Sequence, residues 1–455
     1  MSLKRFFPAV LACLLQAITL TGCHSPAATF MSNGQSAFDA KQYNVAAIEY
    51  TKAIEAEPSL AQAYIMRGRS YANEAHFDLA IQDLNRGIEL DSRSADGYLR
   101  RANCYNSMKK YEESIADYNK VISLEPGNAQ AFTGRGRAYM ALQQYQQALT
   151  DLSKAIEIDP GSHNAYYHRG WTYRFMEDYS RAIADFSKSI DISASWLSYN
   201  SRAYCYMLGP KDYVKAIADL DQAIGINCKD ADSYYLRGNC HLLIKNYAEA
   251  IQDYNMAETL QFADIFNLYL QRATCYSAIK DLDNAIAQAD RAIEIKPNDA
   301  SIFNNRGWWH LEKGNYAKAL SDIKRAIELD PNSERSANWW DSRGWYFYKT
   351  GEIQRAIQDL SKALEINPNI DAAYEIYCHR AQCFFAVHEY TKALSDLDRA
   401  LQLNSAYAEA YYYRGQCYRA LNQIEKARSD FQSCISSSNE ATLTEKARLE
   451  IGDLK

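Results

Sequence analysis

Apolar residues recur along the chain at spacings that indicate pairs of amphipathic helices. An aromatic residue, a Gly or Ala four places later and most often a Tyr three places after that would share one helical face. This group returns about every 34 residues, and an Ala usually follows twelve residues after the small residue. Such a period predicts helix–turn–helix repeats that bury their apolar faces by stacking on one another.

We number each repeat so that the small residue is position 8, which yields twelve repeats over roughly residues 27 to 441. Position 8 is filled by Gly34, Gly68, Ala102, Gly136, Gly170, Ala203, Gly238, Ala273, Gly307, Gly344, Ala381 and Gly415. Position 4 is aromatic in every repeat, from Phe30 to Tyr411, and Pro126 and Pro160 lie near repeat ends. Small residues at positions 8 and 20 let two helices approach closely, and Pro stops the second helix.

These columns resemble the tetratricopeptide repeat family, and the resemblance covers about nine-tenths of the chain. It implies an all-α fold, a right-handed superhelical solenoid of about 12 repeats in which the first helix of each repeat lines the concave side. Residues 442–455 carry Leu443, Ala447 and Ile451 at helical spacing, so we expect a C-terminal capping helix there.

One column departs from that family. Position 7 is Arg in eleven repeats, where the family often has Leu, and position 23 is Asp in ten repeats. We therefore predict a ladder of Arg–Asp ion pairs between helices of the same or adjacent repeats, with Glu49 as the acidic residue of the first repeat. A row of arginines that binds anions is the alternative.

The first residues indicate an export signal. Lys4 and Arg5 precede an apolar stretch, Phe6 to Leu20, that is shorter than the roughly 20 residues a spanning helix needs. The following Leu20-Thr21-Gly22-Cys23 resembles the lipobox of bacterial lipoproteins. We expect a cleaved signal peptide at residues 1–22, a lipidated Cys23 carrying acyl chains such as palmitate, and a short tether at 23–26. A plain secretory signal with an incidental Cys is the alternative. In enteric lipoproteins an Asp directly after the lipidated Cys is the signal for retention in the inner membrane. His24 stands at that place here, which resembles outer-membrane sorting.

Composition and motifs narrow the classes of function. The net charge of −6 argues against binding nucleic acid, because domains that do so are usually basic. The sequence has no His-Glu-x-x-His or Cys-x-x-Cys metal pattern, no phosphate loop ending in Gly-Lys-Ser/Thr and no Gly-x-Ser-x-Gly. No metal, cofactor or enzymatic activity is predicted.

Six of the eleven cysteines recur at one position of the repeat. They occupy position 10, namely Cys104, Cys205, Cys240, Cys275, Cys383 and Cys417. Helices that pack on one another are about 10 Å apart, and a disulfide needs Cα atoms within about 7 Å, so we expect these six to be small buried hydrophobes. Cys228, Cys378 and Cys434 lie outside the column, and a bridge that involves Cys378 stays open.

In the resembled family, positions 2, 5, 6, 9, 12 and 13 of the first helix line the concave groove. The candidate groove residues here are Trp171, Trp308, Trp345, Tyr167, Tyr204, Tyr235, Asn103, Asn200, Asn239 and Asn304. Asn amides can donate to and accept from a peptide backbone, and aromatic rings add contact area at a low cost in conformational entropy. Alternatively, the rings pack between neighbouring first helices and the amides are solvated.

The Lys and Asn set with which some family members clamp an acidic C-terminus is absent. Positions 5 and 9 of the first three repeats hold instead Met31, Gln35, Ile65, Arg69, Leu99 and Asn103. The sequence thus predicts a lipid-anchored, non-catalytic scaffold of the bacterial envelope, at the outer membrane facing the periplasm, that binds protein or peptide partners. An aromatic groove that binds glycan or peptidoglycan strands is the alternative.

Overall fold

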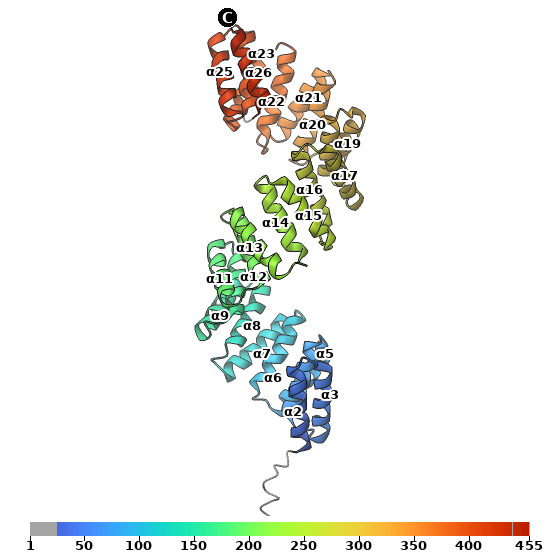
Figure 1. Ribbon diagram of the computed structural model, residues 1–455, viewed down its shortest axis with the longest axis vertical. Coiled ribbons are helices and arrows are strands. Elements are labelled where there is room, and N and C mark those ends of the chain that lie inside the picture. Colours follow the sequence, from blue (N-terminus) through green and yellow to red (C-terminus); the bar gives the residue numbers. More distant parts are fainter. Residues whose placement is uncertain (1–24, 439, 455) are drawn as a thin grey trace, which may run out of the picture. The chain divides into compact units, whose positions relative to one another are not determined.

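The computed structural model describes residues 25–438 and 440–454, and in that part of the chain it has 25 helices and no strand. The helices follow one another as twelve pairs and one last helix (Figure 1). The predicted all-α fold of helix–turn–helix repeats is therefore confirmed. The predicted signal peptide at residues 1–22 and the predicted lipid site Cys23 lie outside the described residues.

The chain divides into an N-terminal unit, residues 1–228, and a C-terminal unit, residues 229–455. The helices of the N-terminal unit are α2 (Pro26–Asp39), α3 (Tyr43–Ala56), α4 (Ala61–Asn73), α5 (Phe77–Leu90), α6 (Ala95–Ser107), α7 (Tyr111–Leu124), α8 (Ala129–Ala141), α9 (Tyr145–Ile158), α10 (His163–Phe175), α11 (Tyr179–Ile192), α12 (Trp196–Leu208) and α13 (Tyr213–Ile226).

The helices of the C-terminal unit are α14 (Ala231–Leu243), α15 (Tyr247–Thr259), α16 (Ile265–Ala278), α17 (Leu282–Ile295), α18 (Ala300–Glu312), α19 (Tyr316–Leu329), α20 (Ser336–Lys349), α21 (Ile353–Ile366), α22 (Ala373–Ala386), α23 (Tyr390–Leu403), α24 (Ala408–Ala420), α25 (Ile424–Ser437) and α26 (Ala441–Asp453). In both units an even-numbered helix opens each repeat. Many first helices also touch the first helix of the next repeat, as α4 touches α6 and α20 touches α22.

Each pair turns on one residue in the left-handed backbone region. These residues are Lys41, Ala75, Lys109, Gln143, Glu177, Lys211, Lys245, Lys280, Gly314, Gly351, His388 and Asn422. The turn lets a backbone N–H beyond the first helix return to a carbonyl of that helix, as His76 N donates to Tyr71 O at 2.9 Å. Glycine adopts this conformation without a Cβ penalty, yet ten of the twelve positions carry a side chain. Packing of the two helices therefore sets the turn.

Small residues hold the two helices of a repeat close together. A Cβ added at Gly136 would lie 2.7 Å from Leu152 Cγ, which is closer than packed carbons allow. Ala148, at position 20 of the same repeat, is fully buried. The six cysteines of position 10 are also buried, as predicted, and all nine described cysteines, Cys378 among them, are free thiols.

The last helix closes the apolar end of the C-terminal unit. Ala447 and Leu454 are buried against Phe431 and Cys434 of α25, and Leu443 packs beside them. Apolar residues of α26 therefore cover the face that a further repeat would otherwise bury. None of the described helices combines the length and the hydropathy that a membrane crossing requires.

Candidate binding face and pocket

The arginines of position 7 pair with the aspartates of position 23 within the same repeat. Ten such pairs are present: Arg67–Asp83, Arg101–Asp117, Arg135–Asp151, Arg169–Asp185, Arg202–Asp219, Arg237–Asp253, Arg306–Asp322, Arg343–Asp359, Arg380–Asp396 and Arg414–Asp430. Arg169 Nε and Nη2 donate to the two oxygens of Asp185 at 2.7 and 2.8 Å. This hydrogen bonding raises the pKa of Arg169, which burial alone would lower.

The third guanidinium nitrogen often reaches the preceding repeat. Arg101 Nη1 donates to Asn85 at 2.7 Å, and Arg169 Nη1 donates to Ser153 at 3.1 Å. In the first repeat, Asn33 replaces the Arg and donates to Glu49 at 3.4 Å. The predicted ladder is confirmed, and its arginines are occupied by internal partners, which argues against an anion-binding row.

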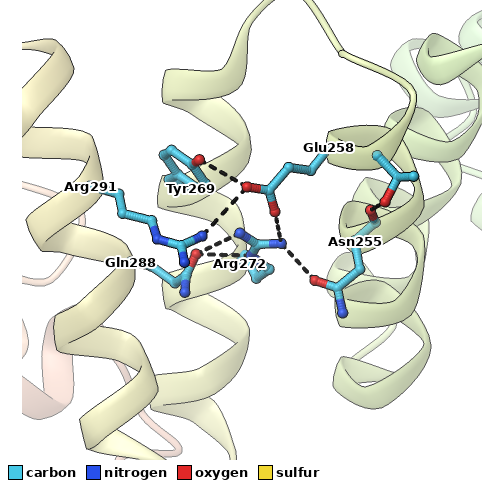
Figure 2. Close-up of polar contacts among 7 residues, drawn as sticks. Asn255, Glu258, Tyr269, Arg272, Gln288 and Arg291 are labelled. Atoms are coloured by element: carbon cyan, nitrogen blue, oxygen red, sulfur yellow. Dashed lines mark hydrogen bonds and ion pairs between the residues drawn. The ribbon is translucent and has the colours of Figure 1, made fainter.

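In the eighth repeat, the arginine of position 7 is paired by residues other than an aspartate at position 23. Its Arg272 is 3 % exposed, and position 23 is Gln288. Glu258 of α15 supplies the negative charge, at 2.7 Å from Arg272 Nη1, and Gln288 of α17 accepts from Nε at 2.9 Å. Figure 2 shows both side chains turned toward Arg272. Asn255 and Tyr269 complete the network, since Asn255 accepts from Arg272 at 2.6 Å and Tyr269 donates to Glu258 at 2.9 Å.

In the N-terminal unit, the predicted groove aromatics pack against one another and against one arginine. Arg174 lies 4.5 Å from the ring of Trp171 on its own helix and 4.4 Å from the ring of Tyr204 on α12. The ring of Tyr167 meets Phe186 of α11 edge to face at 5.7 Å. These three predicted residues are partly buried and link neighbouring helices, as the packing alternative expects.

The predicted asparagines also make internal contacts. Tyr118 donates to Asn103 Oδ1 at 2.6 Å, and Tyr254 donates to Asn239 Oδ1 at 2.8 Å. Asn304 is buried, and its Oδ1 has no hydrogen-bond partner among the described residues. Asn200 is partly buried on α12. Only Asn103 is exposed, so most of these amides are not simply solvated.

A small pocket of about 410 Å³ lies among the first helices α2, α4 and α6 of the N-terminal unit. Arg69, Arg100 and Asn103 line it, together with Phe38. Arg69 lies 4.4 Å from the ring of Phe38, and Arg100 Nε is 2.9 Å from Asp96. The lining of this pocket is basic.

A larger pocket, of about 1250 Å³, lies in the C-terminal unit. Its wall is formed chiefly by the first helices α18, α20, α22 and α24, and two predicted groove residues, Trp308 and Trp345, belong to it. The indole of Trp345 stacks on Tyr348 at 4.8 Å and on His379 at 4.2 Å. The third predicted aromatic of this unit, Tyr235, lies elsewhere and stacks on Phe262 at 4.2 Å.

Carboxylates surround this pocket. His379 Nδ1 is 2.8 Å from Asp341 Oδ1, and Glu375 and Glu409 line the wall on α22 and α24. Burial by itself lowers the pKa of His379, but the negative charges of Asp341, Glu375 and Glu409 outweigh it, so the pKa is raised. Burial raises the pKa of Glu375, although His379 opposes this shift.

Sequence reasoning did not single out His379, Glu375 or Glu409. Each stands at a groove position, since His379 is at position 6 and both glutamates are at position 2. The signal that identifies them is the pair of glutamates at one position of two successive repeats. Among the described residues no group of three His, Cys, Asp or Glu side chains has the arrangement of a metal site.

Sequence comparison finds one kind of repeat over most of the chain. Profiles described as tetratricopeptide repeat or TPR repeat match residues 61–94, 95–128, 136–174, 163–195, 211–267, 266–299, 300–333, 337–370 and 380–438. Heat shock protein STI1 of Saccharomyces cerevisiae is 31% identical over 104 residues, which cover 23% of this chain and 18% of that protein. Protein SGT1 homolog of Bos taurus is 39% identical over 54 residues, which cover 12% of this chain and 16% of that protein. The chain thus spans less than a fifth of the length of these two relatives.

Solved structures whose backbone aligns with this chain include the APC/C hetero-tetramer Cut9-Hcn1. One of its chains aligns over 97% of this chain and 99% of its own length, with 13% identity and a TM-score of 0.49. A tetratricopeptide repeat protein from Parabacteroides merdae aligns over 55% of this chain and 99% of its own length, with 20% identity and a TM-score of 0.44. At these identities the similarity concerns the fold alone.

Proposed function

The chain belongs to the tetratricopeptide repeat family, and from this premise we propose that it is a lipid-anchored, non-catalytic scaffold that holds protein partners in a bacterial cell envelope. Tetratricopeptide repeats serve protein–protein interaction. The observation that carries the proposal is the pocket of the C-terminal unit, where four first helices bring aromatic and acidic side chains together. A concave, partly apolar site with a few polar groups is the usual form of a binding site.

Crosslinking in intact envelopes tests the scaffold. A photoreactive amino acid at Ala406, an exposed residue on the pocket wall, is expected to crosslink to a discrete protein that mass spectrometry identifies. The same group at Lys324, which is exposed on the second helix α19, is the matched control. The same pattern of products at both sites would contradict partner binding at the pocket.

The anchor is supported by Leu20-Thr21-Gly22-Cys23 after a basic and apolar start. Two or more acyl chains give stable membrane attachment. Cys23→Ala is expected to abolish labelling with radioactive palmitate and to release the protein from outer-membrane fractions. Cys13→Ala, which changes the other N-terminal cysteine, is expected to change neither. Retained label in Cys23→Ala would show that the acyl chains are attached to another residue.

Glycan binding is the second candidate, because Trp308 and Trp345 both line the pocket and indole rings can stack on sugars. The faces of Trp345 are already engaged, since Tyr348 and His379 stack on it and Lys349 lies 4.7 Å from its ring centre. We therefore favour a peptide. Calorimetry with muropeptides separates the two, and binding that is lost in both Trp308→Ala and Trp345→Ala would favour the glycan.

A further inference from the structure

The pocket of the C-terminal unit contains more negative than positive charge. Four glutamates line it, namely Glu312, Glu375, Glu409 and Glu440, together with the lysines Lys280 and Lys349 and with His379. Lys280 lies 3.8 Å from Glu312, and His379 is paired with Asp341. Among the described residues, no lysine or arginine forms an ion pair with Glu375 or Glu409.

These two carboxylates are partly buried, and His379, whose positive charge favours the ionised form of Glu375, is already paired with Asp341. Glu409 accepts a hydrogen bond from Tyr407 at 2.7 Å, which satisfies one acceptor but leaves the charge. The rise in the pKa of Glu375 reflects the cost of holding its ionised form away from water. A cation beside them would relieve that cost more than a neutral hydrogen-bond donor would, and an anion would increase it.

Aromatic rings complete the wall on which such a cation would rest. Trp308, Tyr348 and Tyr413 line the same pocket as the two glutamates. The face of an aromatic ring attracts an ammonium or guanidinium group, most strongly where water is excluded. Lys349 shows this chemistry within the pocket, because its ammonium lies 4.7 Å from the ring centre of Trp345.

We propose that this pocket binds basic side chains, lysine or arginine, of an extended segment of the protein partner, an inference that rests on the proposed function. Carboxylates and aromatic faces together suit an ammonium or a guanidinium. Glu375 and Glu409 both occupy position 2, so they are one repeat apart. Helices that pack on one another are about 10 Å apart. Residues i and i+3 of a polyproline II segment lie on one side at about 9 Å, which matches that spacing.

Calorimetry with a defined peptide tests the proposal. The probe is acetyl-Pro-Lys-Pro-Pro-Lys-Pro-amide, and the reference peptide carries Gln in place of both Lys. The full chain is expected to bind the lysine peptide at least tenfold more tightly than the glutamine peptide. The preference is expected to shrink at high salt, because ions in solution screen the attraction between the peptide lysines and the carboxylates of the pocket.

Glu375→Gln combined with Glu409→Gln is expected to remove that tenfold preference. Gln keeps the size of Glu and removes the charge, so the thermal unfolding temperature is not expected to fall. The matched control is Glu249→Gln with Glu294→Gln, which changes the net charge equally at two exposed sites on the second helices α15 and α17. This control is expected to keep the preference.

Three results would overturn the inference. One is equal affinity of the wild type for both peptides, and another is an equal loss in the control variant. The third is a wild type that binds a muropeptide but not the lysine peptide. A partner that still crosslinks at Ala406 while the two peptides bind equally would leave the scaffold in place and remove only this inference.

Discussion

His168 in the N-terminal unit and His379 in the C-terminal unit both stand at position 6 of a first helix, yet their titration shifts in opposite directions. Burial, Arg137 and His163 lower the pKa of His168 to about 4. Three carboxylates overcome burial and raise the pKa of His379. The repeat therefore decides where a side chain stands, while charges on neighbouring helices decide its chemistry.

The same contrast extends over the first helices of the two units. The N-terminal unit carries Arg69, Arg100, Arg137 and Arg174 at groove positions. The C-terminal unit carries Glu375 and Glu409 at such positions, beside the larger of the two pockets. Groove positions of the N-terminal unit thus carry an excess of positive charge and those of the C-terminal unit an excess of negative charge, although Asp39 and Asp96 belong to the first set and Lys349 and Arg419 to the second.

The largest expected loss in the free energy of unfolding comes from variants that remove one carboxylate from a polar network in each unit. Glu258→Gln removes the charge that faces the almost fully buried Arg272 and is expected to cost about 3 kcal/mol. Asp185→Asn is expected to cost about 2 kcal/mol, the value of a hydrogen bond to a charged group, because Arg169 keeps more contact with water. Urea unfolding of the full chain measures both.

The control for these variants is Glu157→Gln, whose exposed ion pair with Lys154 is expected to contribute less than about 1 kcal/mol. A double-mutant cycle between Arg169 and Asp185 measures their coupling directly. If Glu258→Gln cost no more than Glu157→Gln, the network of Figure 2 would not contribute to stability.

A smaller effect is the loss of folding stability that His168 causes as the pH falls. The unfolded pKa is about 6.5 and the folded pKa is about 4, so the folded state binds fewer protons and loses stability as pH falls between those values. Relative to His168→Gln, the wild type is expected to lose about 2 kcal/mol between pH 7.5 and pH 4.5. Parallel stability curves for the two proteins would contradict the shift.

His379 is expected to respond with the opposite sign. Its folded pKa is raised, so the protonated ring stabilises the folded state fully below about pH 6.5, and this contribution is lost as pH rises through the folded pKa. The stability of the wild type relative to His379→Gln is therefore expected to be greater at pH 5.5 than at pH 9. Asp341→Asn is expected to reduce this difference, because it removes the nearest carboxylate.

The smallest effect tests a feature that the two units share. Tyr118 in the N-terminal unit and Tyr254 in the C-terminal unit each donate to an Asn at position 9 of the first helix. Tyr118→Phe and Tyr254→Phe are each expected to cost about 1 kcal/mol. The hydroxyl of Tyr50 has no hydrogen-bond partner among the described residues, so Tyr50→Phe is expected to cost nothing. Unequal values for Tyr118 and Tyr254 would show that the cores differ.

The ion pairs of the ladder could be predicted from the sequence, whereas the contacts of the groove aromatics could not. Arg169 and Asp185 sit in columns that recur in ten repeats, so their pairing could be predicted from the periodicity alone. Trp171 and Tyr204 were correctly placed on first helices, but their contact with Arg174 depends on the angle between neighbouring helices. That angle follows from the packing of several side chains of neighbouring repeats, so it cannot be read from one repeat position.

The sequence by itself determined the helix pairs, their number, the buried cysteines and the Arg–Asp ladder, because each follows from a period that local geometry repeats. The tertiary structure decided which of the groove positions line the pocket of the C-terminal unit. Asp341 lies on α20, more than thirty residues before Glu375 and His379 on α22, and only stacking brings their charges together. Electrostatic interaction depends on distance in space, so the chemistry of the pocket could not be found by counting along the chain.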